Sequence, residues 1–454
     1  MSSPHVGEAS LGRPRPRIHF TPGDGWINDP YGIGWVNGRY ELYYQAVPGS
    51  VTWGPNCHWG HATAPDLVQW SEGPLALAPQ DYEVGCWSGS VVHEADPPTI
   101  FYTRVAGDDW DLGKVATATL DATTGRWTTR SGDVIVDQPP AHLDVRCFRD
   151  PYVFRHGDGW TMLVGAALEG GTAAVLQYHS PDMLTWAYDG ILCSRQSDRT
   201  DAVWTASMWE CPQLFPLGDE WVLLVSVCEA GTLQYVAAAI GGYDGHAFRA
   251  RTWQRLTYGN CAYAMAAFLD RDGRRCVMSW LREEPQGDEP LAERAGAHSV
   301  ASTIELDEGG RLVLRPHQDV VALRARALAG HTDGTGTSYE VVDAPVEINA
   351  VTRPGLEVTI SDDAQSRATL TVGADRDVLV IDRGGYGRET LPLRDSGASV
   401  RILLDADILE VFTAGTYGAY RIAPSCSSGT RVVRIDHGGA GSDGQNIVWP
   451  LTSR

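Results

Sequence analysis

Tryptophans mark comparable segments at a nearly regular interval along the first part of the chain. Trp70, Trp127, Trp186 and Trp253 are 57, 59 and 67 residues apart. The segments also resemble each other directly, because residues 64–70 (APDLVQW) recur as residues 180–186 (SPDMLTW). Repeats of this length, built from short strands, are typical of β-propeller blades. Four tryptophan-marked segments and the one after Trp253 therefore predict five blades, in preference to a chance spacing in a tryptophan-rich chain.

Short apolar strands separated by turns dominate from residue 18 to about residue 282. The clearest are residues 40–45, 160–164 and 221–225, and each follows a turn that contains Gly or Asp. No long helical period interrupts them, and 50 glycines and 26 prolines suit many turns. A chain of 454 residues exceeds the size of one hydrophobic core, so we expect two domains.

The pattern changes towards the end of the chain. Tryptophan is absent from about residue 335 until Trp449, and strands with alternating polarity occur at 356–360, 368–372, 378–381, 400–404 and 410–412. Such strands, joined by tight turns, are typical of a β-sandwich. The sequence therefore predicts an all-β protein, a five-bladed β-propeller followed by a C-terminal β-sandwich. We expect a flexible arm at 1–17, the propeller at 18–315, a linker with a short helix at 316–334 and the sandwich at 335–454.

The net charge of −21 argues against two classes of partner. It would repel nucleic acid and anionic membrane surfaces, whereas a neutral small molecule is indifferent to it. The nine cysteines are scattered without a CxxC pair, which suits reduced thiols. Residues 1–20 lack the apolar run of a signal peptide, and no later segment is apolar enough to span a bilayer. We therefore expect a cytoplasmic protein with no nucleic-acid or membrane partner, while the sequence does not indicate its oligomeric state.

Three carboxylates lie in aromatic and proline-containing segments that are far apart in the sequence. They are Asp29 in residues 26–30 (WINDP), Asp150 in FRDP and Glu210 in WECP. Any one of them alone would more simply be a turn, cap or surface residue. Their separations of 121 and 60 residues, however, match about two blades and one blade of the tryptophan period. Equivalent positions of successive blades line one end of the central channel, so we expect the three side chains to meet there.

These acids fit the two roles in a retaining glycosidase, which uses one carboxylate as nucleophile and one carboxylic acid as proton donor. We expect Asn28 and nearby backbone donors to hold Asp29 ionised as the nucleophile, since hydrogen bonds to the charged form lower a pKa. Glu210 lies between Trp209 and Cys211, and an apolar surround would raise its pKa as an acid/base catalyst requires.

Asp150 is expected to bind sugar hydroxyls through the transition state. Its neighbour Arg149 would face the opposite side in a regular strand, so it either turns into the site or supports it from a neighbouring position. A retaining mechanism also requires the carboxyls of Asp29 and Glu210 to lie roughly 5–6 Å apart.

Around these acids the chain resembles glycoside hydrolase family 32, the invertase, inulinase and levanase group. The family's Trp-Met-Asn-Asp-Pro-Asn-Gly motif corresponds to residues 26–32 (WINDPYG), its Arg-Asp-Pro to residues 149–151 and its Glu-Cys to residues 210–211. The resemblance covers most of the chain and implies a five-bladed propeller with a C-terminal β-sandwich that acts on β-fructofuranosides. It also implies that Asp29 is the nucleophile, Glu210 the acid/base and Asp150 the transition-state stabiliser.

Further stretches fall where the family places fructose-pocket residues or their supports. With the neighbours of the catalytic acids they give the expected substrate-binding residues Asn28, Gln45, Trp53, Trp87, Ser88, Arg149 and Trp280. Near the end of the chain, Asp405 and residues 410–412 (EVF) resemble a late family signature, for which a structural role is expected.

Three departures from the family pattern bear on specificity. Tyr31 stands where the family usually has Asn, Cys261 falls where an Asp-Phe-Tyr-Ala run is usual, and residues 302–305 (STIE) replace the usual Pro-Arg-Glu. The chemistry should survive these changes. The loss of an acid and the addition of an aromatic ring near the pocket would instead change which sugar or leaving group the protein accepts.

A metal site is not expected. Cys57, His58 and His61 are close in sequence, but residues 58 and 61 of a strand face opposite sides, and no carboxylate lies at a suitable spacing. The expected chemistry needs no metal and no cofactor.

The sequence therefore predicts a retaining β-fructofuranosidase that hydrolyses sucrose or short fructo-oligosaccharides through a covalent fructosyl-enzyme. A fructosyltransferase is the nearest alternative, in which a sugar hydroxyl replaces the attacking water. A furanosidase for arabinose-type sugars is a second, which the Tyr31 and Cys261 departures leave open. A sugar-binding or protein-binding propeller without catalysis is a third, although the presence of all three acids argues against it.

Overall fold

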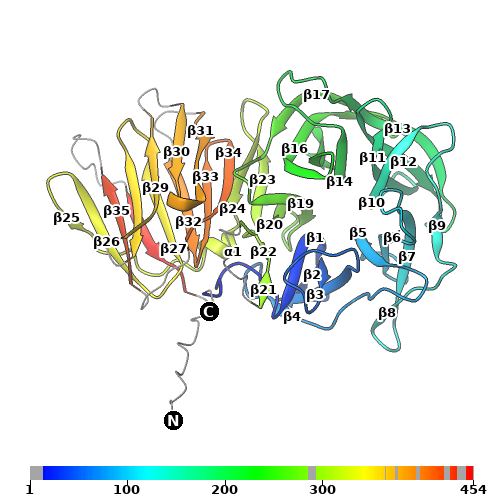
Figure 1. Ribbon diagram of the computed structural model, residues 1–454, viewed down its shortest axis with the longest axis horizontal. Helices are drawn as coiled ribbons and strands as arrows, with labels where there is room; N and C mark the ends of the chain where they lie inside the picture. The colour runs from blue at the N-terminus through cyan, green and yellow to red at the C-terminus, as the bar shows by residue number, and fades with distance from the viewer. Residues whose placement is uncertain are drawn as a thin grey trace, which may run out of the picture.

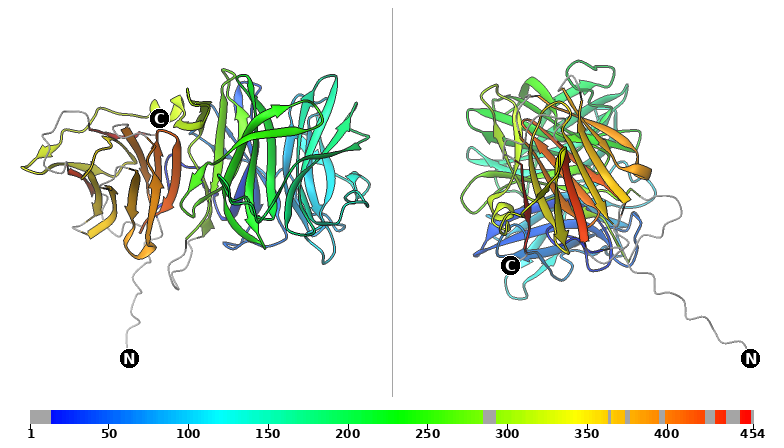
Figure 2. Two further views of the ribbon diagram at one scale, coloured as in Figure 1. Left: turned by 90° about the horizontal axis from the view of Figure 1, so that it is seen from above. Right: turned by 90° about the vertical axis from the view of Figure 1, so that its left-hand side faces the viewer.

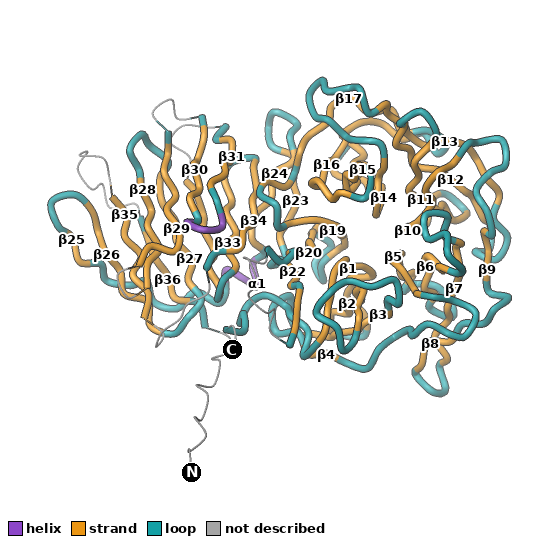
Figure 3. Tube along the Cα trace, in the orientation of Figure 1, coloured by secondary structure: helices purple, strands orange, loops and turns teal. Residues whose placement is uncertain are grey.

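Strands are the main regular structure of the molecule, and loops and turns connect them (Figure 3). The structure, a computed structural model, describes residues 14–284, 293–362, 365–373, 377–394, 399–423, 430–436 and 446–452. Within these ranges the helical elements are α1 (Gln318–Val321) and the 3₁₀ helix η1 (Gly384–Tyr386). None of the helices described has the length and apolar character needed to cross a membrane. The molecule is therefore all-β, as the strand pattern predicts.

Five sheets are built from residues 25–316, each starting with a long strand. The first contains β1 (Gly25–Val36), β2 (Arg39–Val47), β3 (His58–Ala64), β4 (Ser71–Glu72) and β21 (Arg294–Ala295). The second contains β5 (Gly85–Val92), β6 (Thr99–Val105), β7 (Lys114–Asp121), β8 (Arg126–Thr128) and β9 (Val134–Val136). The third contains β10 (Val145–His156), β11 (Gly159–Leu168), β12 (Thr172–Ser180) and β13 (Ala187–Gln196).

The last two of these sheets follow the same plan. The fourth contains β14 (Met208–Leu217), β15 (Glu220–Glu229), β16 (Thr232–Tyr243) and β17 (Phe248–Arg255). The fifth contains β19 (Ala262–Leu269), β20 (Arg275–Leu281), β22 (Ala297–His298), β23 (Ser302–Leu306) and β24 (Leu312–Pro316). In every sheet the first two strands pair antiparallel as a hairpin.

The five sheets surround a common centre, with their first strands innermost (Figure 1). These strands contact one another in the order β1, β5, β10, β14 and β19, and β19 also contacts β1. The late strand β21 pairs in parallel with β1, where Gly25 and Trp26 face Arg294 and Ala295. Residues from all five sheets can therefore meet at one centre although they are far apart in sequence.

Each first strand has an irregularity at a comparable point. The pairing register shifts between Ile27 and Pro30 in β1, Trp87 and Gly89 in β5, Arg149 and Tyr152 in β10, Glu210 and Gln213 in β14, and Tyr263 and Ala266 in β19. Asp150, Cys211 and Ala264 have φ angles of 64°, 48° and 45° at three of these shifts. Bulges of this kind redirect a side chain that a regular strand would turn away.

The C-terminal part consists of two packed sheets. A six-stranded sheet has the order β18 (Thr257–Tyr258), β34 (Thr416–Arg421), β33 (Ile408–Thr413), β32 (Ser399–Asp405), β27 (Val346–Val351) and β36 (Ile447–Pro450). A seven-stranded sheet has the order β25 (His331–Thr332), β26 (Gly336–Val342), β35 (Thr430–Asp436), β28 (Glu357–Asp362), β29 (Gln365–Val372), β30 (Val378–Asp382) and β31 (Arg388–Pro392). Both contribute to one apolar core that includes Ile348, Leu370, Ile402 and Val433.

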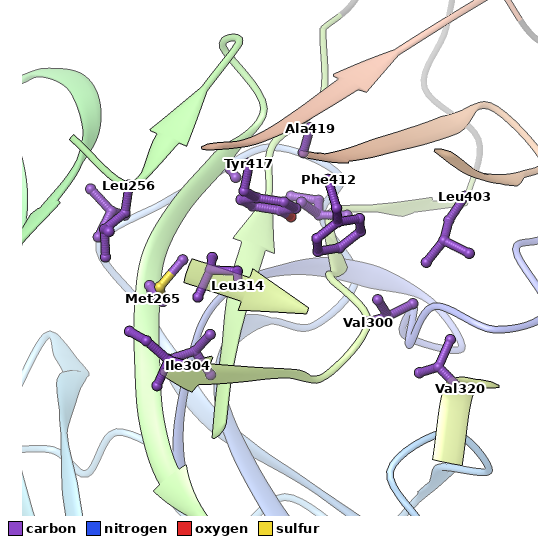
Figure 4. Close-up of a cluster of buried hydrophobic side chains, with 14 of the residues drawn as sticks. Leu256, Met265, Val300, Ile304, Leu314, Val320, Leu403, Phe412, Tyr417 and Ala419 are labelled. Carbon is purple, nitrogen blue, oxygen red and sulfur yellow. The ribbon is translucent and has the colours of Figure 1, made fainter. Parts of the chain in front are cut away.

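A shared apolar core fixes the C-terminal part against the ring of sheets, and the two lie side by side (Figure 2). Leu256 and Leu314 of the ring pack in one buried cluster with Phe412 and Tyr417 of the six-stranded sheet (Figure 4). Strand β18, which follows the fourth sheet, pairs in parallel with β34. Because the contact is both apolar and hydrogen-bonded, it holds the fourth and fifth sheets in place.

The chain segment that precedes β1 is also tied to the C-terminal part. Of the predicted arm, residues 1–13 lie outside the described residues. The backbone amides of Arg17, Ile18 and His19 donate to the carboxylate of Asp405 at 2.8–3.2 Å. The His19 ring lies 3.0 Å from Asp405 Oδ2 and 2.7 Å from Glu410 Oε2. These two acids of the late signature therefore make structural contacts between the two parts of the molecule.

Candidate active site

A cavity of about 780 Å³ opens at the centre of the five sheets. Every residue that the sequence predicts for the site lines it: Asp29, Asp150 and Glu210, together with Asn28, Gln45, Trp53, Trp87, Ser88, Arg149 and Trp280. The acids come from β1, β10 and β14, and each lies at or within two residues of its strand's register shift. The cavity thus depends on the bulges that turn these side chains toward the centre.

Asp29 lies in a network of hydrogen bonds. Asn28 Nδ2 donates to its Oδ1 at 3.1 Å, and Cys211 Sγ lies 3.5 Å from its Oδ2. The Ser88 hydroxyl lies 2.6 Å both from Asp29 Oδ2 and from Gln45 Oε1, so its single proton can be given to either acceptor. Burial raises the pKa of Asp29, and the hydrogen bonds from Ser88 and Asn28 offset part of this rise. Asn28 is therefore the donor that was expected, but the expectation of a lowered pKa for Asp29 is wrong, because burial has the larger effect.

Asp150 is the most enclosed of the three acids. Its backbone amide donates to Thr103 Oγ1 at 2.8 Å, and its Oδ2 accepts from the backbone amide of Cys211 at 3.0 Å. Burial raises the pKa of Asp150 to about 7, although the Arg149 guanidinium acts in the opposite direction. The Cys211 thiol lies 3.7 Å from Asp150 Oδ2 and so stands between Asp150 and Asp29.

Glu210 is held by one hydroxyl and one guanidinium. The Tyr263 hydroxyl donates to Glu210 Oε2 at 2.7 Å, and Arg149 Nη1 lies 3.5 Å from Oε1. Burial raises the pKa of Glu210, and Arg149 and Tyr263 offset part of the rise. A raised pKa agrees with the expectation for a proton donor, but enclosure in the cavity, rather than its sequence neighbours alone, is the cause.

Arg149 turns into the site, which was one of the two positions expected for it. The bulge in β10 allows this, because adjacent residues of a regular strand would face opposite sides. Its guanidinium lies over the Trp87 ring at 5.4 Å from the centroid and reaches Asp111 Oδ1 at 3.2 Å. Arg149 thus connects an aromatic wall of the cavity with two acids.

The tryptophans differ in how they face the cavity. Trp87 and Trp280 are buried, whereas Trp53 is 45% exposed. Trp53 packs edge-on against Trp87, and Trp280 packs edge-on against Trp26, which also lines the cavity. The buried pair forms fixed walls, and Trp53 offers an accessible ring at the mouth.

The cavity is also lined by residues that were not expected from the sequence. Tyr263, Trp110, Asp111 and Arg146 also line it. Tyr263 follows Glu210 by 53 residues, close to the repeat interval, so the spacing was a usable signal. Asp111 and Trp110 lie in the connection between β6 and β7, where no repeat or motif marks them.

The family can be assigned from the sequence of the five-sheet part. Residues 19–316 match the model of the glycosyl hydrolases family 32 N-terminal domain, which is more than half of the chain. The chain belongs to glycosyl hydrolase family 32. The motifs around Asp29, Asp150 and Glu210, which carry the resemblance, all fall within the matched residues.

Relatives within family 32 cover most of the chain. Sucrose-6-phosphate hydrolase of Salmonella typhimurium is 30% identical over 434 residues, covering 91% of this chain and 89% of that protein. Sucrose-6-phosphate hydrolase of Escherichia coli is 33% identical over 329 residues, covering 68% of this chain and 66% of that protein. Among solved structures, a Bombyx mori GH32 beta-fructofuranosidase is 26% identical with a TM-score of 0.82, covering 96% of this chain and 94% of that one.

The departures from the family 32 motifs lie outside the cavity lining. Tyr31 is buried and packs on Trp59 at 4.0 Å between ring centroids. Cys261 is buried, and its thiol donates to the backbone oxygen of Arg282 at 3.3 Å. Neither residue lines the catalytic cavity. Both side chains pack into the protein interior, and burial, followed by the nearby Asp29 charge, raises the pKa of Tyr31. The effect of these changes on the choice of sugar therefore stays a prediction.

In the described part of this family 32 chain, two clusters of His, Cys and Asp side chains have the spacing of metal ligands, but protein groups form hydrogen bonds or ion pairs with them. Within the described residues, His179, Asp189 and His246 form one cluster away from the cavity. Gln177 Nε2 lies among their ligand atoms, 2.7 Å from Asp189 Oδ2 and 3.2 Å from His179 Nε2. A second cluster, Asp270, Cys276 and His317, is buried, and Arg274 pairs with Asp270 at 2.7 Å. Neither cluster belongs to the site.

Proposed function

We propose that this family 32 enzyme is a retaining β-fructofuranosidase that cleaves sucrose or short fructo-oligosaccharides. Hydrolysis of terminal β-D-fructofuranosides is the reaction of its named relatives, which include a raffinose invertase, a levanase and β-fructofuranosidases. The observation that carries the proposal is that Asp29, Asp150 and Glu210 line one cavity, with the thiol of Cys211 between the two aspartates. A mutant of the Bombyx mori enzyme has been solved with sucrose, which supports a small neutral sugar as ligand.

In the proposed reaction, the carboxylate of Asp29 attacks the anomeric carbon of the fructosyl unit while Glu210 gives its proton to the departing glycosidic oxygen. The bond between that carbon and oxygen breaks, the leaving sugar departs as an alcohol, and the fructosyl group is held as an ester of Asp29. Glu210, now a carboxylate, takes a proton from water as the water attacks the same carbon. The ester bond breaks, Asp29 is released, and the configuration is retained.

The surroundings of the acids suit these roles. Burial raises the pKa of Glu210, which favours the protonated acid needed for the first step. The hydrogen bonds from Ser88 and Asn28 favour the charged form of Asp29 and so offset part of the rise in its pKa that burial causes. In our proposal Asp150 accepts hydrogen bonds from fructosyl hydroxyls, and Asn28 and Gln45 orient the ring. Trp53, Trp87 and Trp280 supply apolar walls of the kind that sugar-sized pockets use.

We also propose a division of the architecture into domains. The five sheets would be the five blades of a propeller formed by residues 18–315, preceded by an arm at 1–17. Residues 316–334 would be the linker, which includes α1, and residues 335–454 the sandwich domain. The first strands of the five sheets contact one another in chain order around the centre, and β19 also contacts β1, which supports the five-blade interpretation. The cytoplasmic location remains a prediction from the sequence.

Asp29→Asn tests the catalytic role most directly. The variant should lose at least about 10³-fold in kcat on sucrose, because an amide cannot form the fructosyl ester. The matched control is Asp198→Asn, which makes the same change at an exposed site and should retain full activity. Glucose release with a coupled assay gives the rates, and circular dichroism checks the fold. Full turnover by Asp29→Asn would contradict the proposal, and absence of turnover in the unmodified protein would favour a non-catalytic sugar-binding role.

A fructosyltransferase is the second candidate reaction on this scaffold. It would release glucose in excess of fructose, because part of the fructose would be transferred to another sugar. Hydrolysis releases the two in equal amounts. The relatives named above are hydrolases, so we expect equal amounts.

A further inference from the structure

Both cationic side chains that line the cavity already form ion pairs with carboxylates. Among the described residues that line the cavity, Arg146 and Arg149 are the only Lys or Arg. Arg149 lies 3.2 Å from Asp111 Oδ1 and 3.5 Å from Glu210 Oε1. Arg146 Nε is bound by Glu169, and its Nη2 lies 3.7 Å from Asp144 Oδ1. Both guanidinium charges are therefore already paired with carboxylates of the protein.

The cavity as a whole favours neutral ligands. Four carboxyl groups line it, those of Asp29, Asp111, Asp150 and Glu210, beside two guanidinium groups, so the lining holds no excess of positive charge even when Glu210 carries the proton of the proposed first step. The chain has a net charge of −21, so the wider field adds no attraction for an anion. A phosphate monoester entering the cavity would add about −1.5 to −2 charges at pH 7.

The residues at the mouth suit an uncharged sugar. Trp53 and Trp110 line the cavity and are 45% and 38% exposed, so their rings remain accessible. Ala230, Gly231 and Leu233 add an apolar or neutral edge from the connection between β15 and β16 and the start of β16. An indole ring binds the apolar face of a sugar without requiring a charge, whereas phosphate recognition relies on charge-assisted hydrogen bonds.

We infer that the enzyme accepts fructosides whose leaving sugar is uncharged and discriminates against the same fructosides with a phosphate on that sugar. This inference rests on the proposed function, since it concerns the leaving group of that reaction. It separates the chain from relatives whose names specify a phosphorylated substrate. The reason is that a phosphate would have to displace Glu169, Asp144 or Asp111 from an arginine, or remain without a cationic partner in the cavity.

The first test compares sucrose with sucrose phosphorylated on O6 of its glucose. We expect kcat/KM to be at least about tenfold higher for sucrose at low ionic strength, with a smaller ratio at high salt because screening weakens repulsion between charges. Equal or faster cleavage of the phosphorylated sugar would overturn the inference and leave the proposed function intact. Cleavage of neither sugar would overturn the proposed function itself.

The second test releases Arg146 from its carboxylate. Glu169→Gln should raise kcat/KM for the phosphorylated sugar about three- to tenfold and leave that for sucrose unchanged, because Glu169 does not line the cavity. The matched control is Glu220→Gln, which releases Arg251 from a 2.7 Å ion pair at the far end of the β14–β15 hairpin. That control should leave both substrates unchanged. A substrate ratio in Glu169→Gln equal to that of the unmodified enzyme would contradict the assigned cause.

Discussion

At the scale of single residues, the site is controlled by charges that reach Glu210 from outside its own strand. Arg149 lowers the pKa of Glu210, while Asp29 and Asp111 raise it, and all act on a carboxyl whose pKa burial has already raised. Asp111 is 73% exposed at its side chain and pairs with Arg149, so it adjusts the site from the rim. The proposed proton donor, Glu210, is therefore influenced by a loop residue that no motif marks.

Asp111→Asn should move the alkaline limb of the pH–rate profile to lower pH. In its proposed role as proton donor Glu210 must hold a proton, so kcat/KM should fall as the pH rises through its pKa. Removing the Asp111 charge lowers the pKa of Glu210 in two ways. A negative charge near Glu210 is lost, and Arg149, which no longer pairs with Asp111, acts more strongly on Glu210. Because Asp111 is exposed, we expect a shift of only a few tenths of a pH unit. Profiles on sucrose measure it, with Asp108→Asn as the control in the same loop, and a shift to higher pH would contradict the assignment.

At the scale of elements, close approach between neighbouring strands places the acids. Gly165 lies on β11 opposite Arg149 of β10. A Cβ atom at this position would lie 2.3 Å from the backbone oxygen of Trp209 and 3.3 Å from that of Arg149. The glycine therefore allows β14 to approach the third sheet directly before Glu210. The distance between β14 and the third sheet, which carry the proposed catalytic residues Glu210 and Asp150, therefore depends on a glycine that takes no part in the chemistry.

Gly165→Ala should separate these strands and disturb Glu210. Forcing a methyl group into this contact should destabilise the protein by about 1–3 kcal/mol. We expect kcat to fall more than about tenfold, because catalysis is sensitive to small displacements of the reacting groups. Thermal unfolding and sucrose turnover measure the two effects. Gly242→Ala on β16, where nothing lies within 4 Å of the added atom, is the matched control and should change neither. Unchanged activity in Gly165→Ala would show that β14 does not need this contact.

At the scale of the whole molecule, a buried charge cluster connects the start of the ring with the sandwich. His19, Asp405 and Glu410 have side chains that are at most 2% exposed. Burial alone would lower the pKa of His19, but its hydrogen bonds to Asp405 and Glu410 outweigh burial and raise the pKa to about 9. A charged imidazole between two carboxylates thus holds the segment before β1 against the six-stranded sheet.

The His19 cluster predicts a stability that depends on pH. Because the pKa of His19 is higher in the folded protein than its ordinary 6.5, its contribution is complete below about pH 6.5 and is lost as the pH rises through about 9. The difference corresponds to on the order of 3 kcal/mol. Denaturant unfolding between pH 6 and 10 should show a smaller decline for His19→Gln than for the unmodified protein. His331→Gln, an exposed histidine on β25, should follow the unmodified protein. Parallel declines in all three proteins would exclude the cluster as the cause.

The sequence by itself was sufficient to predict the fold class, the family and which three acids meet in the cavity. The alternation of short strands specifies an all-β chain, because side chains of a strand alternate between two faces. The interval between equivalent segments also predicted that Asp29, Asp150 and Glu210 would meet, since equivalent positions of repeated sheets face a common centre. Strand alternation and motifs are local features and the repeat interval is a periodic one, and both kinds of feature can be read directly from a sequence.

Only the tertiary structure decided how the acids are tuned and which neighbours matter. Asp111 reaches Arg149 across 38 residues and His19 reaches Asp405 across 386, and no local pattern encodes either contact. Tyr31 and Cys261, which depart from the family motifs, turned out to be packed in the interior. Whether a side chain faces the cavity or the core depends on bulges and strand register, which are set by how neighbouring strands pair and not by the residue type.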